Sequence, residues 1–270
     1  MHAVKENVEL RPIRTRARFS APRAITALIL REIITAYGRH FGGYLWAFLE
    51  PVGSILALAF LLSLGFRAPP LGENFAIFMA TGFMPYLMFL ETNNRVAHAL
   101  RFSQQLLSFP RVTFLDAIVA RFVLVTLTRA VVSFAILFVI VTLWKTNTVF
   151  EPGPVFMGFG LAACLGLGCG LANAILLLRF SFWGSIWNMV VRVLMLTSGV
   201  IFLIEDLPEP YATWLVWNPI AHLPALVRAG FYHGYEPAYG SAFYVMGFAL
   251  VLGTPALLFL KAVHRELLEK

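Results

Sequence analysis

The sequence predicts an all-α integral membrane protein. It has six transmembrane helices, an N-terminal amphipathic interface helix, and two short re-entrant or interfacial helices between spans five and six. Hydrophobic residues make up 59% of the 270 and charged residues 13%, about half the charge of an ordinary globular domain. Such a chain cannot cover itself with polar surface in water, so the bilayer is the expected solvent. The backbone finds no water there and the apolar runs do not alternate, which favours helical spans.

Three regions follow one another along the chain. Residues 1–23 are polar and arginine-rich, which predicts a flexible basic cytoplasmic tail near anionic headgroups. Residues 24–42 carry apolar side chains at helical spacing with arginines on another side, the pattern of an amphipathic helix in the interface plane. Residues 43–270 hold the six-span transmembrane domain.

Six apolar runs each exceed the roughly 20 residues needed to cross a hydrocarbon core. They fall at about 44–66, 75–95, 117–143, 154–178, 182–204 and 241–262. Pro85 interrupts the second run, and Arg179 and Ser181 mark a tight turn between the fourth and the fifth.

The stretch 211–233 is nearly apolar enough for a seventh span. Pro219 and Pro224 would break a helix there, and Asn218, His222 and Arg228 would be stranded in lipid. Two short helices around Asn218-Pro219, tucked into the outer leaflet, fit the residues better.

The distribution of basic residues predicts the orientation. Of the 21 lysines and arginines, fifteen fall on one side of a six-span arrangement, and only Arg67, Lys145 and Arg228 fall on the other. Basic residues gather in the cytoplasm, so both termini are expected there. This bias accounts for the net charge of +7 without a nucleic-acid partner.

The sequence offers no catalytic constellation. None of the four lysines follows a glycine, which excludes the nucleotide-binding loop G-x-x-x-x-G-K-[ST], and the six histidines show no metal-binding spacing. We therefore expect no catalytic residue, metal or cofactor in this chain. Small residues between Cys164 and Gly170 predict close packing of helices.

Four ionisable residues inside the spans are costly to bury unless they are paired or face water. They are Glu50, Glu91, Arg129 and Arg192. One interpretation is a polar pathway for an anionic substrate. The other is structural pairing between helices, for example Arg192 with Glu50 or Glu91.

Aromatic residues near the span ends also allow two interpretations. Tyr44, Trp46, Trp183 and Trp187 are candidates for a surface on which sugars stack, and equally for interface anchors. The connection at residues 100–110 mixes apolar and polar side chains. It predicts a short amphipathic helix that docks a partner, or an ordinary solvated loop.

Three stretches together resemble the membrane subunit of type 2 ABC exporters for surface polysaccharides, closest to the capsular-polysaccharide permeases. LREIITAYGRHFGGYLWAFLEP (30–51) is similar to the family's interface helix and first span. LLSFPRVTFLDAIVAR (106–121) resembles its cytoplasmic connection between spans two and three. SGVIFLIEDLP and WNPIAHLPALVRAGFYHGY, within 198–235, resemble its fifth span and external re-entrant helices.

The resemblance implies a homodimer in the cell inner membrane with two copies of a nucleotide-binding ATPase, which would bind ATP and Mg. A lipid-linked polysaccharide would pass between the membrane subunits, among membrane lipids, toward a periplasmic adaptor and an outer-membrane export channel. The ionisable and aromatic residues of the spans give the substrate-path candidates Tyr44, Trp46, Glu50, Arg129, Trp183, Trp187 and Arg192. The resemblance places ATPase-coupling candidates at Arg31, Arg39, Leu100, Gln104, Gln105 and Pro110. It places external-gate candidates at Trp217, Asn218, Pro219, His222 and Arg228.

Other functions share parts of this pattern. An exporter of O-antigen or teichoic acid has the same plan. A membrane-embedded glycolipid-modifying enzyme would need an acidic cluster such as Glu205, Asp206 and Glu209, although these acids are equally suited to end the fifth span. A secondary transporter is disfavoured because no inverted halves are visible in the sequence.

Overall fold

The structure is a computed structural model that describes residues 25–31, 33, 42–102, 113–144, 146 and 148–268. The described chain forms helices joined by turns. The helices are α2 (Gly42–Gly65), α3 (Phe75–Ala97), α5 (Phe114–Leu143), α6 (Pro152–Arg179), α7 (Trp183–Thr197), α8 (Tyr211–Val216), α9 (His222–Ala229) and α10 (Ala242–Leu268), with 3-10 turns η1 (Ile204–Asp206) and η2 (Pro219–Ala221). Residues 25–31 are also helical, within the predicted interface helix.

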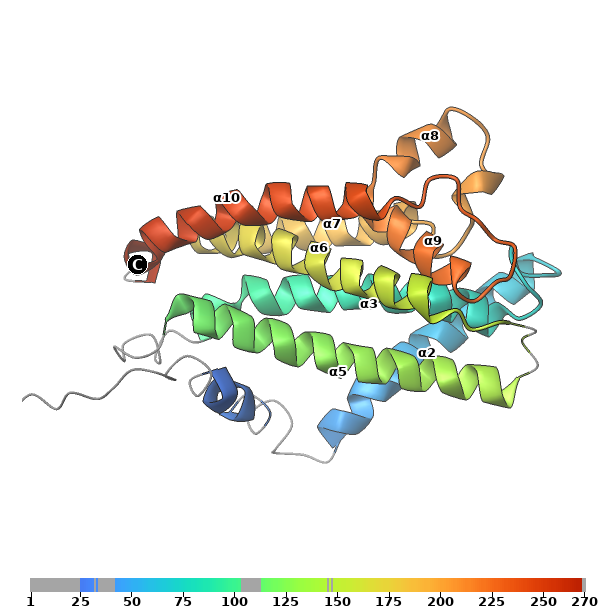
Figure 1. Cartoon of the computed structure of the whole chain (residues 1–270), viewed down its shortest axis with the longest axis horizontal. Helices are drawn as coiled ribbons and strands as arrows, with labels where there is room; N and C mark the ends of the chain where they lie inside the picture. The colour runs from blue at the N-terminus through green and yellow to red at the C-terminus, as the bar shows by residue number, and fades with distance from the viewer. Residues whose placement is uncertain are drawn as a thin grey trace, which may run out of the picture.

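Helix α3 lies at the centre of the bundle. In its most apolar stretch 72% of the residues are buried, compared with 17% in α2. It packs between α5 and α6, and α10 packs on α6 (Figure 1). The large side chains Phe78, Tyr86 and Phe89 of α3 are almost fully buried in the main core.

Helices α2, α3, α5, α6 and α10 are long and apolar enough to cross a membrane, which confirms five of the predicted spans within a few residues at most ends. The third span begins earlier than predicted, because Thr113 and Asp116 form a capping box at the start of α5. The predicted interruption at Pro85 is wrong. Helix α3 continues through this buried proline, since neighbouring helices can support such a site in a membrane protein.

The fifth predicted span, 182–204, is not one continuous helix. Helix α7 has 15 residues, which gives a length of about 22 Å, below the roughly 30 Å of a hydrocarbon core. The chain then leaves the helix through Gly199, whose φ of 67° is positive, and reaches η1. The count of six spans therefore stays a prediction.

The predicted break at Asn218-Pro219 is present. Helix α8 ends at Val216, and the side chain of Asn218 caps η2 by accepting a hydrogen bond from the Ile220 amide at 3.1 Å. Helices α8 and α9 lie together at one end of the bundle (Figure 1). Whether they enter the outer leaflet stays a prediction.

Small residues of α6 allow close helix packing, as predicted. A β carbon on Gly166 would lie 2.7 Å from the Phe89 carbonyl oxygen of α3, and one on Gly170 would lie 2.8 Å from Val96. On the other face, a β carbon on Gly168 would collide with the backbone of Ala249 in α10. Helix α6 therefore contacts α3 and α10 almost backbone to backbone.

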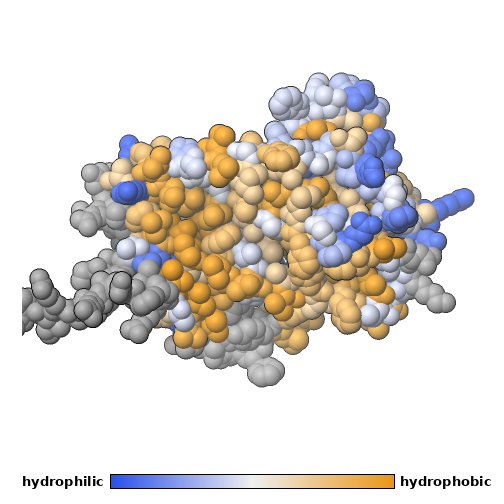
Figure 2. Space-filling model, in the orientation of Figure 1, coloured by the Kyte–Doolittle hydropathy of each residue, from blue (hydrophilic) through white to orange (hydrophobic). Residues whose placement is uncertain are grey.

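Basic residues finish two helices at one end of the bundle. At the end that we call the basic end, α3 finishes with Arg95 and α6 with Arg179, and Leu260 of α10 packs against both helices. The opposite end carries the start of α6, with α8 and α9. Apolar side chains cover much of the flank between them (Figure 2), and Leu64, Phe138 and Val251 are among the most exposed, as expected for contact with lipid or another membrane subunit.

Candidate functional site

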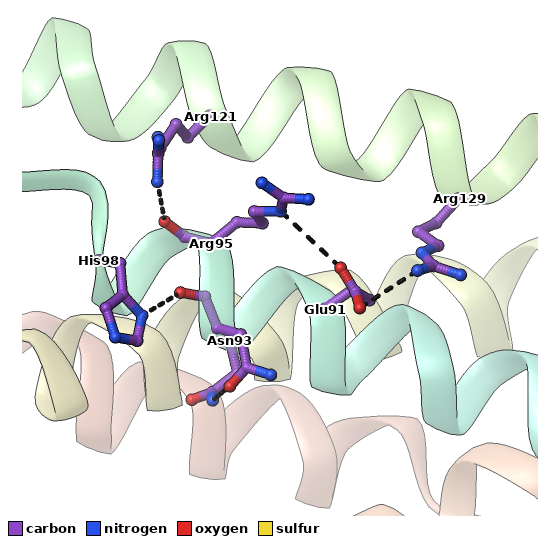
Figure 3. Close-up of polar contacts among 7 residues, drawn as sticks. Glu91, Asn93, Arg95, His98, Arg121 and Arg129 are labelled. Atoms are coloured by element: carbon purple, nitrogen blue, oxygen red, sulfur yellow. Dashed lines mark hydrogen bonds and ion pairs between the residues drawn. The ribbon is translucent and has the colours of Figure 1, made fainter. Parts of the chain in front are cut away.

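A chain of charged side chains links α3 to α5 near the basic end (Figure 3). The carboxylate of Glu91 lies 3.1 Å from the Arg129 guanidinium and 3.8 Å from Nε of Arg95. The Arg129 side chain is 13% exposed and that of Glu91 is 26% exposed. The pair is thus partly screened from solvent, and it compensates the charge of an arginine well inside the third span.

A second contact joins the N-terminal helical segment to this region. The Arg121 guanidinium of α5 lies 4.0 Å above the Phe102 ring, and Arg31 lies 5.8 Å from the same ring. Such cation–π contacts hold a cation beside an aromatic face. Arg121 also donates a hydrogen bond to the Arg95 carbonyl at 3.4 Å. One ring at the start of the 103–112 connection therefore contacts both α5 and the segment at residues 25–31.

These side chains border a cavity of about 600 Å³ that we call the basic cleft. It is lined by Glu91, Asn94, Arg95, His98, Arg101, Phe102 and Arg121. Three guanidinium groups face one carboxylate there, and that carboxylate already contacts Arg129. Each guanidinium carries five N–H donors in a fixed planar arrangement. The basic cleft is therefore suited to an anionic group such as a phosphate or a carboxylate.

Beneath the cleft, a buried polar chain connects three helices. Asn173 of α6 donates a hydrogen bond to the Asn93 side chain of α3 at 2.8 Å, and its oxygen accepts one from the indole of Trp183 at 2.8 Å. Asn93 and Asn173 are almost fully buried. These hydrogen bonds give the buried polar side chains their partners and fix the relative position of α3, α6 and the start of α7.

Two of the four aromatic candidates lie beside a cavity between helices. Trp183 is held by Asn173, and both Trp183 and Trp187 line a mostly apolar cavity of about 280 Å³ between helices. Both side chains are partly exposed, and their contact with a sugar stays a prediction. Trp46 on α2 is 65% exposed and stays a candidate, while the side chain of Tyr44 lies outside the described residues.

The predicted pairing of Arg192 with Glu50 or Glu91 is wrong. Glu91 pairs with Arg129 instead, because α3 packs directly on α5. Arg192 and Glu50 are exposed on α7 and α2. Those two helices pack little within the chain, so their charged groups face outward from the bundle.

Two of the six coupling candidates lie within the described residues. Leu100 is 1% exposed in a small core formed by the basic ends of α3, α5, α6 and α10. Arg31 contacts Phe102, as described above. The other four lie outside the described residues, namely Arg39, Gln104, Gln105 and Pro110.

The gate candidates at the opposite end divide into buried and exposed groups. Arg228 is 1% exposed and His222 is 2% exposed, whereas Trp217 is 71% exposed. The guanidinium of Arg228 donates hydrogen bonds to the carbonyls of Gly199 at 2.7 Å and Val200 at 2.8 Å. Burial lowers the pKa of Arg228, and the negative charge of Glu205 acts in the opposite direction.

His222 also has a defined chemical state. Its Nδ1 accepts a hydrogen bond from the Ser241 amide at 3.2 Å, so Nε2 carries the proton that is shared with the Val216 carbonyl at 2.9 Å. Burial lowers its pKa, opposed by hydrogen bonds to backbone groups. Neutral His222 therefore joins α8, η2 and the start of α10. Asn218 and Pro219, the remaining gate candidates, form the break between α8 and η2.

Sequence reasoning missed several residues of the site. Arg95, His98, Arg101 and Arg121 were counted for orientation or left aside, yet they line the basic cleft. Helical spacing is the signal that could have found two of them, since Glu91 and Arg95 are four residues apart on one face. The partners on α5 and α6 depend on tertiary packing and carry no local signal.

The fold and the buried charges define a multi-span membrane protein with polar groups at both ends of its central helix. Residues 23–232 match the ABC-2 type transporter family. The chain therefore belongs to the ABC-2 type transporter family, as the resemblance predicted.

Curated relatives match most of the chain. It is 28% identical to the capsule polysaccharide export inner-membrane protein CtrC of Neisseria meningitidis, over 85% of this chain and 87% of the relative. It is 29% identical to the polysialic acid transport protein KpsM of Escherichia coli, over 84% and 88%. It is 30% identical to the capsule polysaccharide export inner-membrane protein BexB of Haemophilus influenzae, over 89% of each chain.

Proposed function

We propose that this chain is the inner-membrane permease subunit of an ABC transporter that exports lipid-linked capsular polysaccharide. The similarity to CtrC, KpsM and BexB over nearly the full length of each carries the proposal. The permease would act as a homodimer with two separate ATPase subunits that bind ATP and Mg. Both termini would lie in the cytoplasm, in keeping with the positive-inside bias.

The basic cleft supports this assignment. In the proposed orientation it opens at the cytoplasmic end of the bundle, where an anionic lipid-linked polymer would first meet the permease. Arg95, Arg101 and Arg121 would attract the anionic groups of the substrate. The partly exposed pair of Glu91 and Arg129 would continue the polar surface into the third span.

The contact at Phe102 supports coupling to an ATPase. Arg31 and Arg121 both lie beside this ring, which stands directly before the 103–112 connection. A subunit bound at that connection would act on α5 and on the N-terminal segment through the same side chain. A periplasmic adaptor and an outer-membrane channel would continue the pathway beyond the opposite end.

Reconstitution tests the proposal. The full chain is purified with its partner ATPase, placed in proteoliposomes, and supplied with lipid-linked capsular polysaccharide. We expect ATP-dependent movement of the polymer across the bilayer and none with an ATPase that cannot hydrolyse ATP. Movement of O-antigen or teichoic acid but not of capsular polymer would reassign the substrate. Absence of polymer movement and of stimulated ATP turnover would overturn the proposal.

A cleft variant sharpens the same experiment. Arg95→Gln combined with Arg121→Gln removes two positive charges from the basic cleft, and Arg67→Gln removes an exposed charge outside it. We expect the double variant to need a substrate concentration about tenfold higher, as for the loss of charge-assisted hydrogen bonds. The Arg67 variant should behave as the wild type.

A further inference from the structure

The segment after α7 leaves backbone carbonyls that a continuing helix would have used. The apolar run extends to Leu203, but the helix ends at Thr197. The carbonyls of Gly199, Val200 and Phe202 lie beyond that end and have no donor within the helix. Within a bilayer or a packed core, each such group must find a donor elsewhere.

Arg228 of α9 supplies the donors. Its Nη1 donates to the carbonyls of Gly199 at 2.7 Å and Phe202 at 3.3 Å, and its Nη2 donates to the carbonyl of Val200 at 2.8 Å. The planar guanidinium can bond several acceptors in a fixed geometry, which a lysine ammonium cannot reproduce. We call this set of hydrogen bonds the Arg228 clamp.

Helix α3 completes the clamp. The guanidinium lies 4.0 Å above the ring of Phe78. A β carbon on Gly82 would lie 2.7 Å from Nη2 of Arg228 and 2.8 Å from the Val200 carbonyl oxygen. Only a residue without a side chain leaves room for both. The clamp therefore joins α9, the segment at 198–203 and α3 at one point.

We infer that Arg228 is a positioning residue for export, and this rests on the proposed function. By joining the three elements, the clamp makes α8 and α9 follow any displacement of α3. The other end of α3 borders the basic cleft, which Phe102 also lines. A movement started there would reach the opposite end of the bundle through α3 and the Arg228 clamp.

The chemistry favours a positional role over simple filling of space. An apolar side chain would fill the same volume without the cost of burying a cation, and such replacements are often neutral or stabilising in soluble proteins. An apolar side chain would, however, leave the carbonyls at 199, 200 and 202 without these donors. The arginine fixes the direction in which the unwound segment leaves α7.

Hydrogen–deuterium exchange tests the clamp in the full-length purified protein, independently of transport. Arg228→Lys retains the charge but loses the planar guanidinium with its several N–H donors. Gly82→Ala places a methyl group against the guanidinium. We expect both variants to increase exchange at amides 199–206 by about tenfold, the factor for loss of one charge-assisted hydrogen bond. Gly160→Ala is the matched control, because a β carbon there meets no atom within 4 Å. Unchanged exchange in both variants would refute the clamp.

Transport with the partner ATPase tests the positioning role. Arg228→Gln should lower export by about tenfold while ATP hydrolysis stays within about twofold of wild type, and Arg228→Lys should recover part of the export. The double variant of Arg228→Lys and Gly82→Ala should be no worse than the poorer single variant, because both act on one contact. Wild-type export, or a parallel loss of export and hydrolysis, would overturn the role. If the wild type itself exports no polymer, the proposed function fails, and the exchange experiment still decides whether the clamp exists.

Discussion

The two ends of helix α3 contact arginines of other helices by different means. At the basic end, Arg129 faces the carboxylate of Glu91, and both side chains keep partial contact with solvent. At the opposite end, Arg228 is 1% exposed and donates to three backbone carbonyls. A side-chain ion pair can exchange partners, whereas backbone carbonyls stay where the fold places them.

This difference suits the two ends to different tasks. Glu91 lines the basic cleft together with Arg95, so an incoming anion can compete with Glu91 for a guanidinium. The Arg228 clamp has no comparable freedom because Gly82 and Phe78 of α3 enclose it. We therefore expect substitutions that change charge to matter most at the basic end. Substitutions that change side-chain volume or hydrogen-bond geometry should matter most at the opposite end.

The largest expected effect compares the two arginines directly. Arg228→Met should lower the free energy of unfolding by about 3–5 kcal/mol, because three carbonyls lose their donor in a closed site. Arg129→Met should cost about 1 kcal/mol, since Glu91 keeps some solvent and still lies near Arg95. Both are measured by denaturation of the purified protein followed through tryptophan fluorescence. Equal losses of unfolding free energy in the two variants would contradict the expected difference between the two ends.

Reversing the ion pair should have an intermediate effect. Glu91→Arg places two like charges beside each other and should lower the stability by about 1–2 kcal/mol, discounted because the pair is partly exposed. Adding Arg129→Glu should recover about half of this loss, whereas Arg129→Met should recover less, because it removes the repulsion without restoring an ion pair. The coupling free energy of the double-mutant cycle is the measurement. A coupling near zero would show that the 3.1 Å contact contributes nothing to stability.

Local patterns in the sequence predicted most of the helices and part of the site. The apolar runs located five spanning helices, and Asn218-Pro219 located the break between α8 and η2. These features depend on residues that are close in the chain. The end of α7 at Thr197 was not visible in the same way, because apolar residues continue beyond it as far as Ile204. The carbonyls beyond this end accept hydrogen bonds from Arg228, which lies about thirty residues further along.

The same distinction explains the error in pairing. Arg129 and Glu91 were each recognised as costly groups inside spans, but their partnership depends on α3 packing against α5. Hydropathy gives the depth of a residue in the membrane and says nothing of which helices are neighbours. The role of Gly82 was hidden for the same reason, since it is defined by the Arg228 side chain from another helix.

Ionic strength should change the stability contributed by the two ends to different extents, and this difference should be smaller than the effects above. Raising the salt concentration from 0.05 to about 1 M shortens the screening length to roughly 3 Å and weakens partly exposed charge pairs. The stability difference between wild type and Glu91→Gln should therefore shrink by a few tenths of a kcal/mol. The difference between wild type and Arg228→Met should stay constant. A salt dependence at Arg228 would mean that solvent reaches the clamp.

The smallest expected effect is a pH dependence at the opposite end, through His222. Burial lowers the pKa of His222, so the folded protein favours the neutral ring, whose Nδ1 accepts the Ser241 amide hydrogen. A base with a lowered pKa binds fewer protons in the folded state than in the unfolded state. Its contribution to stability is therefore full above the unfolded pKa of about 6.5 and is lost as the pH falls below that value.

The His222 contribution can be isolated by substitution. Burial raises the pKa of the neighbouring Tyr239, whose ring lies 5.6 Å away, so this phenol stays neutral in this range. The Tyr244 ring lies 5.0 Å away. His222→Gln keeps an acceptor without an ionisable ring, so its unfolding temperature should depend less on pH between about 5 and 6.5 than that of wild type. His233→Gln, at an exposed histidine of the same region, is the matched control and should keep the wild-type slope. Equal slopes for wild type and His222→Gln would show that the ring can be protonated in place, and that the opposite end of α3 adapts to charge as the basic end does.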